Sequence, residues 1–299
     1  MIEYFQFFPT LRCNNSCEFC FSRHLNYSKD FPEEKIEHLI KTMLQNNIYK
    51  LDILGGEPFL YLHLCRLIDK ATKNDMEVTI SSNGTLIEEI DSFLNRFKDR
   101  KVKIGISIND TPNKALLELI EKHKVWIKTV VTKNKFPERS LLEFAKNHGI
   151  KYYLIYMDAL TERDMPESMP FYEFMEKIRE IKVLYTDVEA VFCKGFIGGN
   201  DYRCPAGLEK ITLMPDGSVY PCYLLAGLKE YKLGNIFESS LKQLLSSELL
   251  NIFRNFEGNI CNNKICHFYN ECKGGCIAHS IIHYGRNNKS DPRCRKEEK

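Results

Sequence analysis

The chain has 299 residues, of which 43% are hydrophobic and 12% aromatic, so it can bury a substantial core. Its 42 basic and 40 acidic residues give a formal charge of +2, which disfavours a strongly basic nucleic-acid-binding protein and an acidic disordered tail. No run approaches the roughly 18 consecutive apolar residues of a membrane helix, and the first residues do not form a secretory signal. We therefore expect a cytoplasmic protein that binds neither nucleic acid nor membrane.

Six short β-branched and aromatic runs recur through the first half, and each is followed by a longer amphipathic stretch. The runs begin near residues 2, 50, 77, 102, 126 and 151. Strands and helices that alternate at this spacing predict a parallel sheet with right-handed crossovers, either open or part of a barrel. Helices are expected over 33–45 and 113–124, where apolar residues recur at helical spacing behind a proline.

The pattern changes in the second half of the chain. Residues 171–184 predict one more helix leading out of the sheet, and we expect a domain boundary between about 183 and 193. The two domains then cover residues 1–190 and 191–299. In the second, 211–222 reads as two short apolar runs about a Pro-Asp-Gly turn, which predicts a hairpin. A helix from about Ser239 to Phe256 is expected to follow.

The twelve cysteines are unevenly distributed: three lie between 13 and 20, one is at 65, and eight lie between 193 and 294. Reducing conditions disfavour structural disulfides, so the cysteines indicate metal ligands or catalytic thiols. Cys65 lies on the apolar face of a predicted helix, and we expect a buried core thiol there.

Cys13, Cys17 and Cys20 form a C-x3-C-x2-C pattern directly after the first predicted strand. Pro9 and Asn14 favour a loop over a helix with three buried cysteines on one face. Three thiolates on a loop can hold three irons of a 4Fe–4S cluster and leave the fourth open to a ligand. A catalytic zinc with three protein ligands is the alternative.

With its lead-in FPTLR, the segment CNNSCEFC resembles the defining motif of the radical S-adenosylmethionine (SAM) enzymes, and the likeness extends over nearly the whole chain. It implies that the three cysteines hold a 4Fe–4S cluster that binds SAM. The segment 55–58, Gly-Gly-Glu-Pro, is similar to the family segment that holds the methionine amino group. The cofactor-binding residues implied by the resemblance and by their place at strand ends are Phe19, Gly55, Gly56, Glu57, Ser82, Asn83 and Ser107.

The C-terminal cysteines resemble the SPASM extension of radical SAM enzymes that modify peptides and proteins. Gly217-x4-Cys222 matches that pattern, and the four residues between Cys261 and Cys266, where the pattern has two, lengthen one loop without removing a ligand. The resemblance implies two auxiliary 4Fe–4S clusters. The first would be held by Cys193, Cys204, Cys222 and Cys276, and the second by Cys261, Cys266, Cys272 and Cys294.

One or two structural zincs are the alternative for this tail. His267, His279 and His283 are expected to be surface or packing residues rather than ligands. The expected fold is a partial (β/α)6 TIM-like barrel with a smaller cysteine-rich C-terminal SPASM domain.

The implied activity is reductive cleavage of SAM to a 5′-deoxyadenosyl radical, which abstracts hydrogen from a substrate. A peptide or protein is the substrate we expect. Small-molecule or cofactor biosynthesis is the alternative, and a non-catalytic iron–sulfur electron carrier is a different class. An electron carrier does not need a three-cysteine cluster with an open iron beside Gly-Gly-Glu-Pro. This feature therefore argues against the electron-carrier hypothesis.

Tyr223 occupies the position at which the related sulfatase maturases carry an aspartate that serves as base. A tyrosine, whose ordinary pKa is near 10, is a poor base at neutral pH but can donate a proton or hydrogen atom. We therefore do not expect sulfatase maturation, and we expect Tyr223 to be catalytic. The expected partners are the substrate and a one-electron donor such as a ferredoxin or flavodoxin. Since the first strand begins near residue 2, a peptide would bind directly or through a separate recognition protein.

Overall fold

The computed structural model describes residues 2–192, 195–196, 204–261, 266–285 and 289–294. In this part of the chain eleven strands form one sheet in the order β11-β10-β9-β1-β2-β3-β4-β5-β6-β7-β8. They are β1 (Tyr4–Phe7), β2 (Lys50–Ile53), β3 (Glu77–Ser82), β4 (Val102–Ser107), β5 (Trp126–Val131), β6 (Tyr152–Tyr156), β7 (Val188–Phe192), β8 (Gly195–Phe196), β9 (Lys210–Leu213), β10 (Ser218–Tyr220) and β11 (Gly234–Asn235).

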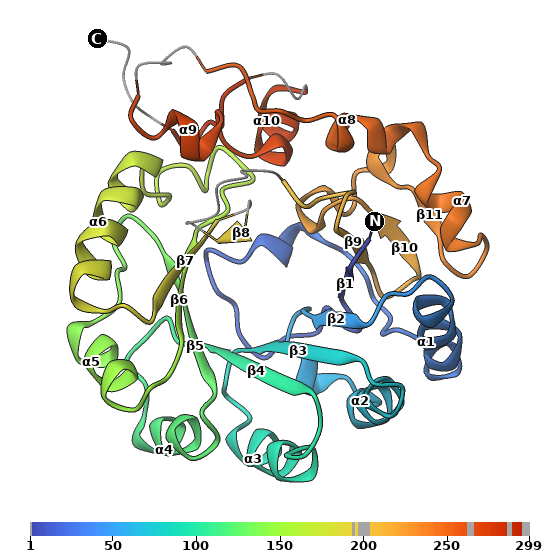
Figure 1. The fold of residues 1–299 in the computed structure, drawn as a ribbon, viewed down its shortest axis with the longest axis horizontal. Coiled ribbons are helices and arrows are strands. Elements are labelled where there is room, and N and C mark those ends of the chain that lie inside the picture. The colour runs from blue at the N-terminus through green and yellow to red at the C-terminus, as the bar shows by residue number, and fades with distance from the viewer. Residues whose placement is uncertain (1, 193–194, 197–203, 262–265, 286–288, 295–299) are drawn as a thin grey trace.

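All neighbouring strands from β9 through β1 to β7 run parallel, whereas β8, β10 and β11 are antiparallel to their neighbours. The six predicted runs are β1 to β6, so the predicted parallel sheet is confirmed. Two further strands, β7 and β9, extend the parallel part beyond the six units. The sheet curves into a barrel (Figure 1). This barrel stays open because β7 and β9 are not paired with each other, so the expected partial barrel is confirmed.

Six helices follow the barrel strands and lie on the outside of the curved sheet (Figure 1). They are α1 (Ile36–Gln45), α2 (Leu64–Lys73), α3 (Ile87–Arg96), α4 (Lys114–His123), α5 (Arg139–Asn147) and α6 (Phe171–Leu184). The helices predicted over 33–45, 113–124 and 171–184 are confirmed within a few residues. The α4 helix starts where the Asn113 side chain accepts a hydrogen bond from the Leu116 backbone N–H at 2.8 Å.

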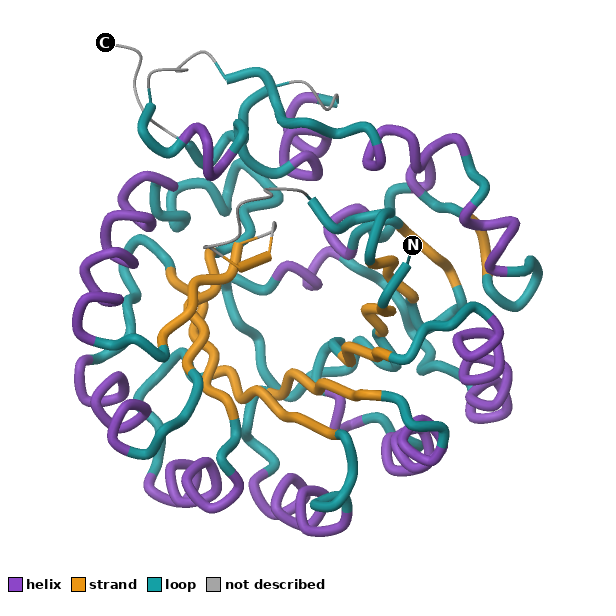
Figure 2. Tube along the Cα trace, in the orientation of Figure 1, coloured by secondary structure: helices purple, strands orange, loops and turns teal. Residues whose placement is uncertain are grey.

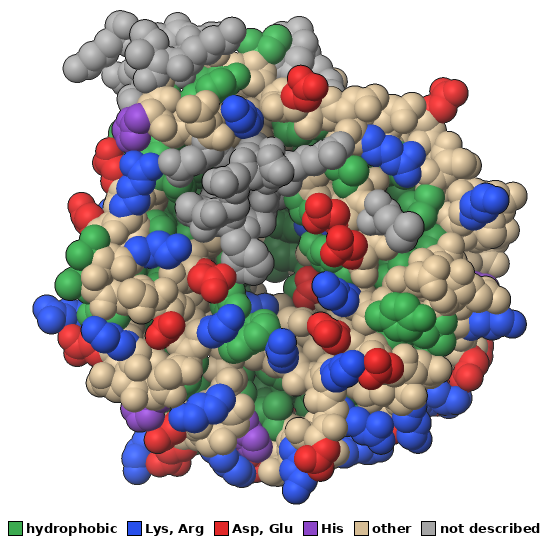
Figure 3. Space-filling view, viewed as in Figure 1, with side chains coloured by type: hydrophobic (Ala, Val, Ile, Leu, Met, Phe, Trp, Pro, Cys, Tyr) green, Lys and Arg blue, Asp and Glu red, His purple; other side chains and the backbone are tan. Residues whose placement is uncertain are grey.

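Burial alternates along the strands, and this alternation separates two sides of the sheet. In β5 the buried residues Ile127, Thr129 and Val131 alternate with partly buried ones. Ile127 and Val131 of the buried set pack under the helices in one large apolar core. The other set faces the inside of the barrel, where the Lys128 ammonium donates to Ser81 Oγ at 2.6 Å. The space-filling view is hollowed at its centre, with charged side chains around the opening (Figure 3).

The C-terminal region covers the side on which the sheet remains open, where β8 pairs with β7 at the edge of the sheet (Figure 2). Its helices are α7 (Leu241–Leu245), α8 (Asn251–Arg254), α9 (Tyr269–Cys272) and α10 (Ile277–Tyr284). The predicted hairpin is confirmed as β9 and β10. Because β9 pairs with β1, the barrel sheet continues into the second predicted domain. The division at about residue 190 stays a prediction.

The single helix predicted from Ser239 to Phe256 is wrong. The chain instead forms α7, a short 3₁₀ turn over Glu248–Leu250, and α8. The Ser246 hydroxyl donates to the Gln243 carbonyl at 2.7 Å, and such local side-chain bonding competes with helix continuation. Among the described residues, no helix is long and apolar enough to cross a membrane.

Candidate functional site

The loop that carries the first three cysteines begins at the end of β1 and lies against the segment after β2. The Gly56 and Glu57 N–H groups donate to the carbonyls of Thr10 and Arg12 at 3.0 and 2.8 Å. A Cβ at Gly55 would lie 2.5 Å from the Thr10 carbonyl oxygen, and one at Gly56 would lie 2.2 Å from that of Arg12. The two glycines therefore allow the cysteine loop to approach this closely.

Asp30 anchors the same loop from the other side. It accepts hydrogen bonds from the Thr10 hydroxyl at 2.6 Å and from the Arg12 guanidinium at 2.5 Å. Arg12 also donates to the Leu60 carbonyl at 2.5 Å. Burial raises the pKa of Asp30, but the bonds from Arg12 and Thr10 outweigh it and hold this pKa below its ordinary value.

The three cysteines of the loop differ in exposure: Cys13 is exposed, while Cys17 and Cys20 are half-buried. The Cys13 sulfur accepts the Asn15 backbone N–H at 3.4 Å, and the Cys20 sulfur lies 3.1 Å from the Ser22 hydroxyl. Burial, followed by the like charges of Cys20 and Cys13, raises the pKa of the Cys17 thiol. Three thiols on an accessible loop fit an iron–sulfur core, whose positive charge would favour the ionised form of Cys17.

The Glu57 side chain is fully buried and is held by the chain itself. One carboxylate oxygen accepts from the Phe59 N–H at 3.1 Å and the Ser82 hydroxyl at 2.9 Å, and the other accepts from the Asn83 N–H at 2.7 Å. Burial raises the pKa of Glu57, although the three hydrogen bonds favour its charged form. Glu57 and Ser82 thus join the segment after β2 to the end of β3.

Asn83, another predicted cofactor residue, contacts the cysteine loop through its side chain. Its amide nitrogen is 3.8 Å from the Cys13 sulfur and donates to the Asn14 side chain at 2.8 Å. Phe19 and Ser107 are half-buried. Within the described residues, no side-chain hydrogen bond joins either of these two to the other predicted cofactor residues, although Ser107 ends β4 beside the end of β3 at Ser82.

The C-terminal cysteines occur in two groups. Cys204, Cys222 and Cys276 are buried in one apolar cluster with residues of α8 and α10. Two adjoining cavities share Cys261, Cys272 and Cys294 in their linings. Cys266 lines one of these cavities, and Cys276 lines the other. The groups follow the two ligand sets expected from the resemblance, and Cys276 lies between them.

Cys193, the remaining predicted ligand, lies outside the described residues. Across the described part of the chain, no three His, Cys, Asp or Glu side chains are placed to share a single metal ion. Cys65 is half-buried and packs against the barrel core.

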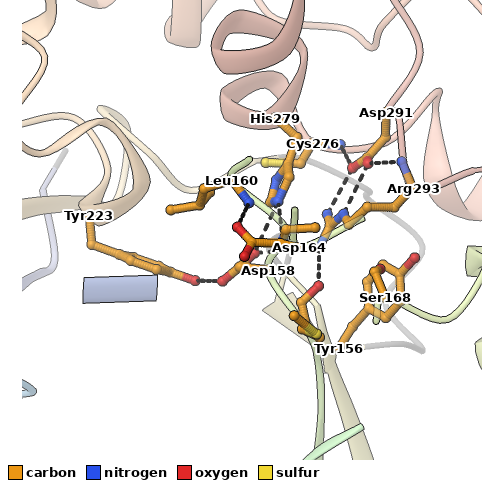
Figure 4. Close-up of polar contacts among 12 residues, drawn as sticks. Tyr156, Asp158, Leu160, Asp164, Ser168, Tyr223, Cys276, His279, Asp291 and Arg293 are labelled. Atoms are coloured by element: carbon orange, nitrogen blue, oxygen red, sulfur yellow. Dashed lines mark hydrogen bonds and ion pairs between the residues drawn. The ribbon is translucent and has the colours of Figure 1, made fainter. Parts of the chain in front are cut away.

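Tyr223 follows Cys222 and points toward the end of β6 (Figure 4). Its hydroxyl donates to the Asp158 carboxylate at 2.7 Å. Its ring lies 4.6 Å from the ring of Phe21, which directly follows the cysteine loop. The structure therefore brings Tyr223 between the cysteine loop and a carboxylate at the open side of the barrel.

Asp158 is in turn part of a buried polar network with the C-terminal region (Figure 4). Arg293, 1% exposed, lies 3.4 Å from Asp158 and donates to Asp291 at 2.8 Å and to the Met157 carbonyl at 2.8 Å. Asp291 accepts from the Cys276 N–H at 2.9 Å. Arg293 and Asp291 thus link Tyr223 and Asp158 to a cysteine of the apolar cluster.

Of the three histidines near the C-terminal cysteines, His267 lies against the ring of Phe268, and His279 and His283 contact the segment after β6. His279 is fully buried; its Nε2 accepts the Ala159 N–H at 3.2 Å and lies 3.5 Å from Asp158. His283 Nε2 lies 2.8 Å from the Ala159 carbonyl. Both histidines are packed against the segment after β6.

Sequence reasoning missed Phe21, Asp158 and Arg293. Asp158 had a usable signal, because it follows the sixth predicted strand and polar residues at the carboxyl ends of barrel strands face the site. Phe21 and Arg293 had none, since each acquires its role through a partner distant in sequence.

Comparisons with known proteins identify two family matches. The model of the radical SAM superfamily matches residues 7–171, and that of SPASM, an iron–sulfur cluster-binding domain, matches residues 204–276. The first match alone covers more than half of the chain.

Individual relatives differ in what they do. The chain is 24% identical over 303 residues to the antilisterial bacteriocin subtilosin biosynthesis protein AlbA of Bacillus subtilis, covering 89% of this chain and 65% of AlbA. It is also 24% identical over 291 residues to GTP 3′,8-cyclase of Helicobacter pylori, covering 84% and 90%. The crystal structure of SuiB from Streptococcus suis superimposes with a TM-score of 0.78 at 19% identity, covering 98% of this chain and 77% of SuiB. SuiB has also been solved bound to its precursor peptide SuiA.

Proposed function

The chain belongs to the radical SAM superfamily and carries a SPASM domain, and from this premise we propose that it modifies a peptide or protein by radical chemistry. It is an enzyme, and its cofactors are 4Fe–4S clusters and SAM. When bound, the reduced cluster and SAM supply a 5′-deoxyadenosyl radical that takes a hydrogen atom from the substrate. The observation that carries the radical proposal is the three-cysteine loop held against the segment after β2, and the grouping of the C-terminal cysteines supports auxiliary clusters.

In this proposal Cys13, Cys17 and Cys20 hold the SAM-binding cluster. The segment 55–57 contacts the methionine part of SAM through its backbone, since the Glu57 carboxylate is already occupied by three hydrogen bonds. Glu57 and Ser82 then fix the position of that backbone. Asn83, beside the Cys13 sulfur, lies within reach of the same cofactor. Phe19 and Ser107 are proposed to contact the nucleoside part.

The C-terminal cysteines are proposed to hold two auxiliary 4Fe–4S clusters, divided as the resemblance implies. The apolar cluster around Cys204, Cys222 and Cys276 supports the first site, with Cys193 as its fourth ligand. The cavities lined by Cys261, Cys266, Cys272 and Cys294 support the second. An external one-electron donor such as a ferredoxin or flavodoxin would reduce the clusters.

A peptide substrate is supported by the likeness to AlbA, whose name places it in bacteriocin biosynthesis, and by the fold shared with SuiB. The likeness to GTP 3′,8-cyclase, which covers 90% of that enzyme, supports a nucleotide as the second candidate substrate. Tyr223 is proposed to donate a proton or hydrogen atom to the substrate. Its hydroxyl already donates to Asp158, so this carboxylate orients it.

The test is an anaerobic assay on protein reconstituted with iron and sulfide, with SAM and a strong reductant, that quantifies 5′-deoxyadenosine by mass spectrometry. We expect Cys17→Ala to abolish its formation. The matched control is Cys65→Ala, which removes a half-buried thiol outside the motif and should retain wild-type formation. Equal activity of the Cys17→Ala and wild-type proteins would refute the assigned site.

The same assay distinguishes the two substrate classes. A change in the mass of a peptide encoded beside the gene would support peptide modification, whereas conversion of GTP would support the nucleotide alternative. Tyr223→Phe keeps the ring and removes the hydroxyl. We expect this variant to form 5′-deoxyadenosine normally while product formation falls at least about 100-fold, as when a proton donor is removed. Unchanged product formation would exclude the proposed role of Tyr223.

A further inference from the structure

Lys210 is a buried lysine at the start of β9, where it pairs with Tyr4 of β1. Only 6% of its surface is exposed. Removing an ammonium from water is costly unless negative charge or hydrogen bonds compensate for it. The position of Lys210 therefore requires an explanation in terms of the groups that surround it.

Buried cysteines are among those groups. Lys210 interacts electrostatically with Cys222, Cys204, Tyr4 and Asp52. The two cysteines are 5% and 4% exposed and share the apolar cluster of Cys276. The ammonium also lies 5.4 Å from the centre of the Tyr223 ring, next to Cys222 in the chain. A buried cation thus lies beside the thiols proposed to hold the first auxiliary cluster.

The backbone of Lys210 holds the loop that carries one of these cysteines. Its N–H donates to the Pro205 carbonyl at 3.0 Å, and its carbonyl accepts the Gly207 N–H at 2.9 Å. Pro205 directly follows Cys204. The loop and the cation are therefore fixed relative to each other by the same residue.

A buried ammonium is stabilised by negative charge close to it, which neutral thiols do not supply. Thiolates bound to iron at Cys204 and Cys222 would supply that charge.

We propose that Lys210 raises the reduction potential of the auxiliary cluster held at Cys204, Cys222 and Cys276. The inference rests on the proposed function in that these cysteines must hold a cluster. Reduction adds one electron, and hence one negative charge, to a buried group. A neighbouring buried cation stabilises the reduced form more than the oxidised form, which shifts the potential upward. Lys210 touches no reacting atom in this proposal and acts only through the cluster.

The test is a potentiometric titration followed by electron paramagnetic resonance on the reconstituted full chain. Measurements in a Cys17→Ala background remove the SAM-binding cluster and leave the C-terminal signals. We expect Lys210→Met to move one of the two midpoint potentials to a more negative value, and Lys210→Arg to restore it. The matched control is Lys101→Met, which removes an exposed lysine that pairs with Asp75 and should shift neither midpoint.

Unchanged midpoints in Lys210→Met, with wild-type iron content, would overturn the proposal. If Lys210→Met loses iron, the comparison is made between Lys210→Gln and Lys210→Arg, which differ in charge, and equal midpoints in these two would overturn it as well. A failure of the underlying site has a separate signature. Cys222→Ala would then keep the full iron content and both C-terminal signals, which shows that no cluster is held at this cysteine.

Discussion

The core between the sheet and helices α1 to α6 consists almost entirely of aliphatic and aromatic side chains, whereas three of the eleven residues buried in the main C-terminal core cluster are cysteines. The barrel buries apolar surface on one face of a long sheet, which suffices to stabilise it. In the described part of the C-terminal region no helix is longer than eight residues, and sulfur takes the place of larger apolar side chains in its core. Under the proposed function, the clusters held at these cysteines would themselves form part of the C-terminal core.

The two regions also differ in how they are joined to each other. Within the barrel, neighbouring strands are joined by backbone hydrogen bonds. Beside the β1–β9 pairing and the apolar side chains that it adds to the barrel core, the C-terminal region contacts the barrel through buried charges, including Arg293 with Asp158 and the Met157 carbonyl. Buried ion pairs add little net stability, but removing one partner leaves an uncompensated charge. The junction should therefore be more sensitive to single polar substitutions than the barrel is.

The largest expected effect is that of removing the clusters. Chelating the iron should lower the hydrogen-exchange protection of α10 by about 1,000-fold or more, because structural metal sites couple on the order of 10 kcal/mol to folding. Amides of β3 and β5 should keep their protection and serve as the internal control. Equal loss in both regions, or none in α10, would contradict the contrast between the two cores.

A smaller effect is expected at the junction. Arg293→Met should reduce the free energy of unfolding by about 3–5 kcal/mol, since Asp158 and Asp291 would remain buried without their guanidinium. The control is Arg139→Met, which breaks an exposed pair with Glu143 on α5 and should change stability little. Urea unfolding measures both. Similar shifts in the two variants would argue against a buried electrostatic junction.

The smallest effect is expected within the barrel, at the anchor of the cysteine loop. Asp30→Asn keeps one acceptor for Thr10 but loses the charge that faces Arg12, and should cost about 1 kcal/mol or less. Because the pKa of Asp30 is lowered in the folded state, its contribution is present above its ordinary pKa of 3.8 and is lost only as the pH falls through the lowered value.

The difference in urea midpoint between wild type and Asp30→Asn should thus stay constant from pH 7 to pH 5. A difference that shrinks over that interval would mean that another group controls the loop. The control is Thr111→Val, which removes a hydroxyl that donates to Glu138 in the barrel. The change in the free energy of unfolding caused by Thr111→Val should be the same in the wild type and in Asp30→Asn.

The sequence determined by itself the features that depend on neighbouring residues. Strand and helix periodicity located β1 to β6, and the Pro-Asp-Gly turn located the β9–β10 hairpin. The three-cysteine motif, with turn-forming residues around it, indicated a cluster loop. These features are readable because a side-chain period of 2 or 3.6 and a turn residue act over only a few positions.

Only the tertiary structure decided what depends on distant partners. The parallel pairing of β9 with β1 extends the sheet beyond six units, and it joins residues about 200 positions apart in the chain. The contact of Tyr223 with Asp158 spans 65 positions, and that of Arg293 with Asp158 spans 135. The strength of such contacts depends on burial and on three-dimensional placement. A linear pattern carries neither. The sequence alone therefore gave no sign that Lys210 lies near Cys222 and Tyr223.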